Sequence, residues 1–106
     1  MDTSKLAPLR NGLLEFLILD IVSSGDVYVA EILGRLATTD FTTREGTLYP
    51  LLSRMRQEGL LDYEWRESTA GPPRKYYRLT RSGREHLAAF REYWATLTNL
   101  IDELGR

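Results

Sequence analysis

The spacing of apolar residues changes abruptly on either side of Gly59. Between residues 48 and 55, three leucines and a methionine recur at helical spacing, which predicts a helix with one buried face. From residue 61 to residue 66, apolar and charged residues alternate, which predicts a half-buried strand. A second short segment at residues 74–79 is rich in tyrosine and would return beside the first. The middle of the chain is therefore predicted to be a helix followed by a β-hairpin.

Helices are predicted on both sides of this hairpin. The segment Leu9–Ser23 is apolar on almost all sides, so we expect it to pack both on the core and on a partner subunit. Val27–Ala37 carries apolar residues at helical spacing, and the last helix is expected to run from Thr80 to about Leu104. Three helices, a hairpin and a long helix make a mainly α fold, the winged helix-turn-helix.

Short polar residues between the helices predict where each helix begins and ends. Gly25 suits the C-terminal end of the first helix, and Asp26 is expected to N-cap the second. Thr42 and Glu45 fit a Thr-x-x-Glu capping box, which would open the third helix. Residues 67–73 are rich in turn-forming residues, so we expect a flexible loop at the tip of the hairpin.

The last predicted helix carries a continuous apolar seam. Thr80 is expected to be its N-cap, and the apolar residues after it are spaced alternately three and four apart, as in a coiled coil. A domain of 106 residues is too small to cover such a long face from within, so pairing with a second subunit is favoured over packing inside one subunit. The predicted dimerisation residues are Leu87, Phe90, Trp94, Leu97, Ile101 and Leu104.

The composition argues against several classes of function. The chain has no cysteine and a single histidine, His86, so a cysteine nucleophile, a disulfide and a metal-binding cluster are not expected. No glycine-rich phosphate loop or other catalytic motif is present, so we expect neither an enzyme nor a bound cofactor. The apolar run at residues 13–22 is far too short to cross a bilayer, and the first residues do not resemble a signal peptide. The expected location is the cytoplasm, without a membrane partner.

Positive charge is concentrated in the middle of the sequence. The net charge is −1, but residues 44–84 hold nine basic and five acidic side chains. Five of the basic residues lie between Arg74 and Arg84 with no acid among them. Because salt confines the field of an exposed charge to about 8–10 Å, a local basic stripe matters more to a phosphate backbone than the net charge does. The stripe indicates nucleic-acid binding, with an ordinary solvated surface as the alternative.

The third predicted helix begins unusually for a structural helix. Gly46 costs about 1 kcal/mol of helix stability but would let another backbone approach closely, and Pro50 should bend or loosen the first turns. Thr47 and Tyr49 offer hydroxyl groups to phosphates, as expected where a helix enters the major groove by its N-terminal end. The alternative is a solvated face on a purely structural helix. The predicted DNA contacts are Arg44, Thr47, Tyr49, Ser53 and Arg54 on this helix, and Arg74, Lys75 and Arg78 on the hairpin.

Two motifs resemble those of the PadR family of bacterial transcriptional regulators. They are G-T-L-Y-P at residues 46–50 and R-K-Y-Y-R-L-T at residues 74–80, and the resemblance extends from Leu13 to about Leu104. It implies a homodimeric winged-helix repressor whose third helix enters the major groove, whose wing contacts the backbone or minor groove, and whose C-terminal helix dimerises. The single C-terminal helix is similar to a compact subgroup that includes multidrug-sensing repressors with a flat, aromatic-lined pore between the subunits.

Two positions depart from the family pattern. The second helix of many members begins with H-G-Y-E-I, whereas residues 28–32 of this chain read Y-V-A-E-I. Arg44 stands where a small capping residue is common two positions before the glycine of G-T-L-Y. An arginine at this position can form a bidentate pair with guanine, so we expect a different base preference.

The resemblance to the compact subgroup also suggests a ligand site between the subunits. Trp94 is too large for tight two-stranded packing, and the first helix contributes Phe16 and an acid, Asp20, within an apolar run. If these residues meet across the dimer, they would form a flat apolar slot with acidic edges, suited to planar cationic aromatic molecules. The alternative is a filled dimer core without free space. The predicted ligand-binding residues are Phe16, Asp20, Leu87, Trp94 and Thr98.

The sequence thus predicts a winged helix-turn-helix DNA-binding domain at residues 1–79 and a C-terminal dimerisation helix at residues 80–106. The expected function is sequence-specific transcriptional regulation by a homodimeric repressor. It would bind double-stranded DNA at an inverted-repeat operator and be released by a small aromatic or cationic molecule. The alternative function is a winged-helix module that binds another protein and neither DNA nor a ligand.

Overall fold

The computed structural model describes residues 4–106 and has the predicted order of elements, with three helices before a hairpin and a long helix after it. The mainly α fold with one antiparallel hairpin is therefore confirmed. The helices are α1 (Ala7–Ser23, after a short 3-10 turn at Ser4–Leu6), α2 (Val29–Leu36), α3 (Glu45–Gln57) and α4 (Arg81–Leu104), and the strands are β1 (Leu61–Ser68) and β2 (Gly71–Leu79).

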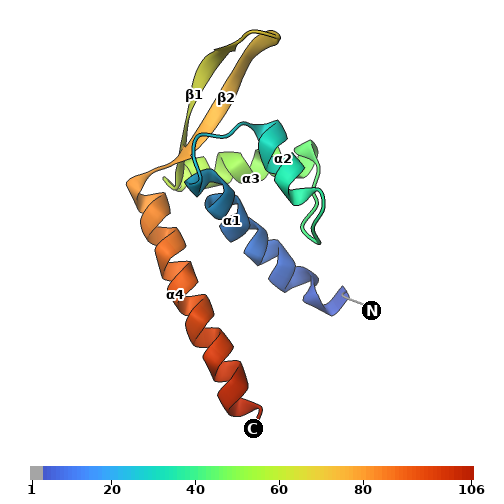
Figure 1. Cartoon of the computed structure of the whole chain (residues 1–106), viewed down its shortest axis with the longest axis vertical. Helices are drawn as coiled ribbons and strands as arrows, with labels where there is room; N and C mark the ends of the chain where they lie inside the picture. The colour runs from blue at the N-terminus through green and yellow to red at the C-terminus, as the bar shows by residue number, and fades with distance from the viewer. Residues whose placement is uncertain (1–3) are drawn as a thin grey trace.

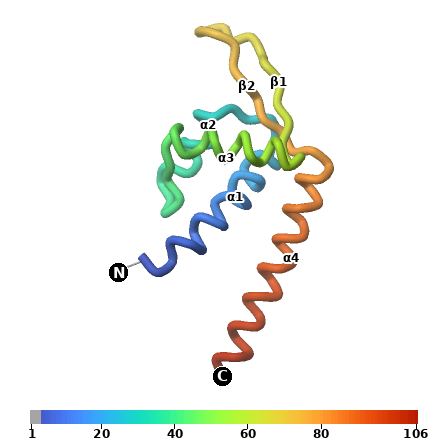
Figure 2. Tube along the Cα trace, turned by 180° about the vertical axis from the view of Figure 1, so that it is seen from behind, coloured from blue at the N-terminus to red at the C-terminus, as the bar shows by residue number. Residues whose placement is uncertain are grey.

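The molecule is elongated, with extents of 57 × 33 × 21 Å. Figures 1 and 2 show α1, α2 and α3 grouped in the middle, the hairpin projecting at one end and α4 running towards the other end. The start of α1 and the end of α4 both point away from the hairpin. The hairpin and the last part of α4 therefore project from the helical body in opposite directions.

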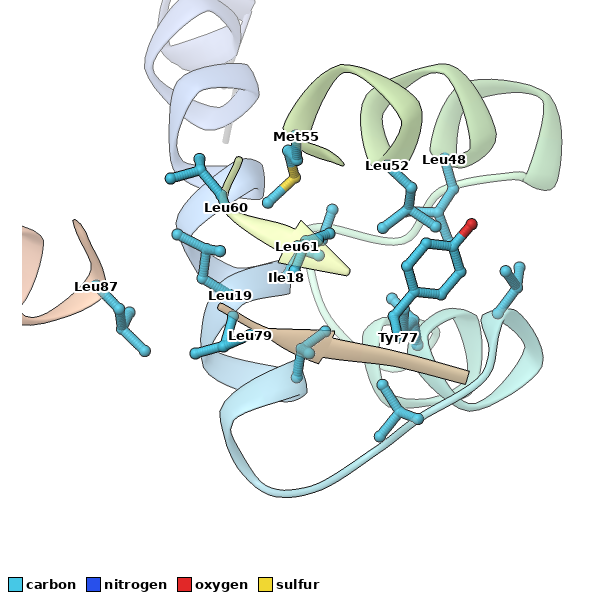
Figure 3. Close-up of a cluster of buried hydrophobic side chains, with 14 of the residues drawn as sticks. Ile18, Leu19, Leu48, Leu52, Met55, Leu60, Leu61, Tyr77, Leu79 and Leu87 are labelled. Atoms are coloured by element: carbon cyan, nitrogen blue, oxygen red, sulfur yellow. The ribbon is translucent and has the colours of Figure 1, made fainter. Parts of the chain in front are cut away.

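A compact apolar core joins the helices to the base of the hairpin (Figure 3). Of the predicted inward stripe of α3, Leu48, Leu52 and Met55 are fully buried, and Leu51 is partly buried against the same core. Ile18 of α1 and Leu61 of β1 pack in the same cluster. Burial of this apolar surface is the main contribution to the stability of so small a domain.

The hairpin is longer than predicted and its loop is shorter. Residues 67–73 were expected to form a flexible loop, but the strands reach Ser68 and resume at Gly71. Only residues 69 and 70 turn the chain. A bulge between Arg66 and Ser68 shifts the register of the two strands near the tip. Trp65, predicted to be half-buried, is 60% exposed because this part of β1 extends beyond the helices.

Two predicted helix caps are wrong. Asp26 was expected to N-cap the second helix, but α2 begins after Tyr28, since Val27 instead forms an isolated antiparallel bridge with Tyr77 of β2. The capping box of Thr42 and Glu45 is also absent, because α3 starts later than this box requires. Its N-cap is Arg44, whose side chain makes no capping hydrogen bond.

The end of α3 and the start of α4 are joined by close backbone contacts. Gly59 adopts a φ of +79°, and the amides after the helix bond back to α3, with Leu60 N 3.0 Å from the carbonyl oxygen of Met55. Thr80 is the N-cap of α4, as predicted: its hydroxyl accepts from the amide of Gly83 at 2.9 Å and donates to the carbonyl of Gly59 at 2.6 Å. These bonds fix where α4 leaves the helical body.

Candidate nucleic-acid interface

The face of α3 opposite the core is exposed and carries small or polar side chains. Gly46, Pro50, Ser53 and Gln57 recur along it at intervals of three and four. Gly46 has no internal reason to be glycine: its φ is not positive, and an added β-carbon would meet no heavy atom within 4 Å. The stripe therefore offers a low, uncluttered surface to any molecule that approaches α3.

Arg44 and Thr47 flank the N-terminal end of this stripe, and both are exposed. Thr47 lines a polar groove of about 360 Å³ together with Arg10 and Asn11 of α1 and the threonines before α3. Arg10 and Asn11 were not among the predicted DNA contacts. Their proximity to Thr47 depends on the packing of α1 against the segment before α3, which no local motif signals.

Arg54 lies on the flank of α3 beside α1. Its guanidinium is 3.3 Å from the carboxylate of Glu15, and its side chain remains 59% exposed. Such an exposed pair contributes little stability and is readily exchanged for another anion. Arg54 is therefore partly neutralised within the chain but still accessible. Ser53, its neighbour, lies on the outer stripe.

Two of the four basic residues on the hairpin are bound to carboxylates. Arg66 forms ion pairs with Asp26 and Glu64, and its hydrogen bond to Glu64 raises the pKa of Arg66 above its usual value. Arg78, a predicted DNA contact, lies 3.7 Å from the other oxygen of Glu64. These acids reduce the positive field of Arg66 and Arg78 at the surface.

The other two cations, Arg74 and Lys75, lie over aromatic rings instead. The guanidinium carbon of Arg74 is 4.5 Å from the ring centre of Tyr28, and the ammonium of Lys75 is 4.4 Å from that of Tyr63 and 5.4 Å from that of Trp65. Neither has an ion pair with an acid in the described part of the chain. Their charge is therefore available to an external anion.

A groove of about 340 Å³ connects these cations to α3. Tyr28 at the start of α2, Glu45 and Tyr49 of α3, and Arg74 and Lys75 of β2 line it. Tyr49 is 44% exposed although it follows the fully buried Leu48. The structure thus brings together three predicted DNA contacts from two elements, and it adds Tyr28, which begins the segment that departs from the family pattern.

The predicted dimerisation seam is divided between the core and the surface. Leu87 is 4% exposed and packs in the core, and Phe90 and Leu97 are half-buried. Further along α4 the residues emerge, and Ile101 and Leu104 are 63% and 76% exposed. The last three turns of α4 therefore present an apolar face that the described part of the chain leaves largely exposed.

Only two of the five predicted ligand-binding residues line the same groove. Phe16 stacks on Phe90 with ring centres 4.0 Å apart, and Trp94 follows 5.9 Å from Phe90. Phe16 and Trp94 line an apolar groove of about 510 Å³ between α1 and α4.

The remaining three predicted ligand residues do not line this groove. Leu87 is buried in the core, and Thr98 donates its hydroxyl hydrogen bond to the carbonyl of Trp94 at 2.9 Å. Asp20 is paired with Arg91, so its charge is already compensated. His86, the single histidine of the chain, does line the groove and stacks on Phe16 with ring centres 5.3 Å apart, although it was not among the predicted ligand-binding residues.

Among residues 4–106, no helix is both long and apolar enough to cross a bilayer. Within the same range, His, Asp and Glu side chains nowhere gather in a group of three that could hold a metal ion.

Comparisons with known proteins agree with the fold and with the two motifs. The model of the PadR-like transcriptional regulator family matches residues 18–89. The chain is similar to an X-ray structure of a PadR-like transcription factor from Bacteroides fragilis, with 39% identity, coverage of 97% of this chain and 99% of that one, and a TM-score of 0.82. It is also similar to a PadR-like transcriptional regulator from Bacillus cereus, with 37% identity, coverage of 93% and 97%, and a TM-score of 0.82.

A curated protein of Lysinibacillus sphaericus, described only as uncharacterized, is 29% identical over 94 residues, which are 86% of each chain. The family match covers more than half of the chain and includes α3, the hairpin and the first third of α4. The family consists of transcriptional regulators and not of enzymes, which confirms the expectation that the chain is not an enzyme. This chain is a member of the PadR-like family of transcriptional regulators.

Proposed function

We propose that the chain is a DNA-binding repressor that acts as a homodimer on an inverted-repeat operator in the cytoplasm. The observation that carries this proposal is the exposed outer stripe of α3 together with a groove that joins α3, through Glu45 and Tyr49, to the cations Arg74 and Lys75. Alpha helices that present small residues at an exposed N-terminal end fit the major groove, and adjacent cations neutralise the phosphates beside it.

The proposed division of the chain follows from the same surfaces. Residues 1–79 would form the DNA-binding winged helix-turn-helix and residues 80–106 the dimerisation helix. The apolar face at Ile101 and Leu104 supports this division, because a protomer alone leaves it in water. Pairing of two α4 helices would hold two copies of α3 at about 34 Å, the separation of successive major grooves.

DNA binding is tested by fluorescence anisotropy with a duplex carrying the inverted repeat upstream of the chain's own gene. With six to eight phosphate contacts per dimer, the slope of log affinity against log salt should be about −5 to −7. A duplex of scrambled sequence is the control and should bind at least about a thousandfold more weakly. No binding to the inverted repeat, together with capture of a protein partner through the same face, would support the protein-binding module instead.

Dimerisation is tested by sedimentation of Ile101→Glu. The substitution places a charge on the exposed apolar face, so it should leave the folded protomer intact and abolish the dimer. Asn99→Glu is the matched control, because it adds the same charge on the exposed polar side of α4, two residues away. A dimer that survives Ile101→Glu would overturn the proposed interface.

We further propose that a planar aromatic molecule binds the groove between α1 and α4 and relieves repression. Stacking on Phe16, Phe90 and Trp94 supports this proposal. Because Asp20 is paired with Arg91, attraction to a free carboxylate contributes less than the sequence suggested. The ligand would act only through a difference in affinity between the DNA-bound and free shapes of the dimer.

Ligand binding is tested with a planar cationic dye and the emission of Trp94 in a Trp65→Phe background, which removes the second fluorophore. Quenching that saturates, and that releases the labelled operator at the same dye concentrations, is the expected result. Unchanged emission would indicate that the groove is filled in the dimer.

A further inference from the structure

The wing contains a row of alternating rings and guanidinium groups that no sequence motif predicts. Arg74 lies over Tyr28, Tyr28 meets Tyr76 edge-on with ring centres 5.4 Å apart, and Arg66 lies 4.6 Å over Tyr76. Tyr28 is the only one of these four residues outside the hairpin, and it is the N-cap of α2. The row therefore ties the wing to the helix-turn-helix.

The two arginines of this row differ in what binds them. They are directly opposite one another in the register of β1 and β2, where like charges repel. Arg66 is held by Asp26 and Glu64, whereas Arg74 lies over the ring of Tyr28 and has no ion pair with any carboxylate of residues 4–106. Because each guanidinium group lies over a different ring, the two groups are kept apart. The charge of Arg74 is not neutralised by a carboxylate of residues 4–106.

The groove beside Tyr28 has the chemistry of a phosphate site. Arg74 and Lys75 contribute two positive charges to its lining and Glu45 one negative charge, and Tyr49 contributes a hydroxyl donor. The residues that line the groove come from the starts of α2 and α3 and from the hairpin, so a duplex seated against α3 would pass the wing there. A DNA backbone phosphate is the anion that this position would meet.

We propose that Tyr28 is a positioning residue for DNA. Its ring holds the guanidinium of Arg74 over the groove, and Arg74 together with the hydroxyl of Tyr49 binds one backbone phosphate per protomer. An arginine side chain loses much rotamer freedom when it becomes ordered, so ordering it before DNA arrives raises the affinity of the contact. The inference rests on the proposed DNA binding and specifies one contact of that interface.

The test is a double-mutant cycle with Tyr28→Ser and Arg74→Gln, measured by anisotropy on the inverted-repeat duplex and on the scrambled one. Serine is favourable at an N-cap, so Tyr28→Ser removes the ring without weakening the start of α2. Arg74→Gln should lower the affinity by about tenfold on both duplexes and reduce the salt slope by about 1.8 per dimer, because a phosphate contact reads no sequence. Tyr28→Ser should reproduce most of this loss, and the double variant should be no weaker than Arg74→Gln alone.

Tyr28→Phe is the matched control. It keeps the ring over Arg74 and lacks only the hydroxyl, so it should bind DNA within about twofold of the wild type. A loss as large as that of Tyr28→Ser would show that the hydroxyl acts and would overturn the positioning role. Additive losses in the double variant would overturn it as well, because two residues that act through one contact do not add.

Two measurements distinguish a failure of this proposal from unfolding of a variant and from a failure of the proposed DNA binding. Each variant is melted first, and if Tyr28→Ser is unfolded, Arg74→Lys replaces it, since lysine keeps the charge without the planar group. Wild-type affinity of Arg74→Lys would then overturn the inference, and reduced affinity on both duplexes would support it. If the wild type itself binds neither duplex, the proposed function fails. If it binds and Tyr28→Ser binds equally well, the positioning role alone fails.

Discussion

Two helical glycines should respond in opposite ways to the same substitution, alanine. Gly83 in the first turn of α4 is buried, and an added β-carbon would lie 2.1 Å from the carbonyl oxygen of Leu60. Gly46 in the first turn of α3 has open space at the same position. Replacing Gly83 therefore tests the packing of α4, and replacing Gly46 tests a surface that this chain itself does not use.

The magnitude for Gly83→Ala follows from the contact distance. Real β-carbons essentially never lie closer than 3.0 Å to another heavy atom, so α4 and Leu60 must separate by about 0.9 Å. That shift lengthens the bond of 3.2 Å between the amide of Thr80 and the carbonyl of Leu60. Overpacking costs about 1–3 kcal/mol and a weakened hydrogen bond up to about 1 kcal/mol, against a gain in helix propensity of up to about 1 kcal/mol. We expect a net loss of about 2 kcal/mol.

The assay is thermal unfolding at a fixed protein concentration, followed by anisotropy with the labelled duplex. For a domain of this size, about 2 kcal/mol corresponds to a melting temperature lower by roughly 10 °C. Gly46→Ala should melt at or slightly above the wild-type temperature, because only helix propensity changes. Its affinity for DNA should nevertheless fall by about tenfold or more, since the new methyl group occupies the surface that faces the groove of the duplex.

Either variant can refute this reasoning. A Gly83→Ala protein as stable as the wild type would mean that α4 does not approach Leu60 as closely as the structure has it. Gly46→Ala with unchanged DNA affinity would mean that α3 does not meet DNA through its outer stripe, whatever its stability.

Three further predictions follow from single contacts. Thr80→Ala removes the N-cap of α4 and the bond to Gly59, and should lower the free energy of unfolding in urea by about 1–2 kcal/mol, with Thr80→Ser recovering most of it. Glu15→Gln frees Arg54 and should raise DNA affinity a few-fold with a change in stability below about 1 kcal/mol, so weaker DNA binding would contradict it. Burial raises the pKa of Tyr77, so the stability it contributes is complete below about pH 10 and is lost as the pH rises through the raised pKa. Tyr77→Phe should lessen this alkaline loss, measured as the urea midpoint between about pH 9 and pH 11.

Local patterns predicted the elements of this fold well. The period of three to four along α3, the alternation in β1 and the position of Thr80 depend on neighbours within a few residues, so each is visible in the sequence. The wrong cap at Asp26 has a non-local cause, because Val27 bridges to Tyr77 of β2 and this contact with a distant segment overrides local preference. At Thr42 the local pattern is suitable as well, but α3 begins after Arg44.

The candidate site was predictable in outline and not in its detail. The motif at residues 46–50 indicated which helix is exposed, and the basic stripe indicated the wing. The stripe did not reveal that Arg78 is paired with Glu64 and that Arg74 is held by Tyr28, a residue 46 positions earlier in the chain. Similarly, the sequence alone suggests that Asp20 is a free acid, but the packing of α1 on α4 pairs it with Arg91.

The junction between α3 and α4 has a mechanical consequence for regulation. The hydroxyl and the amide of Thr80 donate to the carbonyls of Gly59 and Leu60, so the start of α4 is held directly against the end of α3. In the proposed dimer, a rotation of one α4 against its mate would swing the attached α3 through a similar angle. A molecule that separates the two α4 helices would therefore change the distance between the two α3 helices along the DNA.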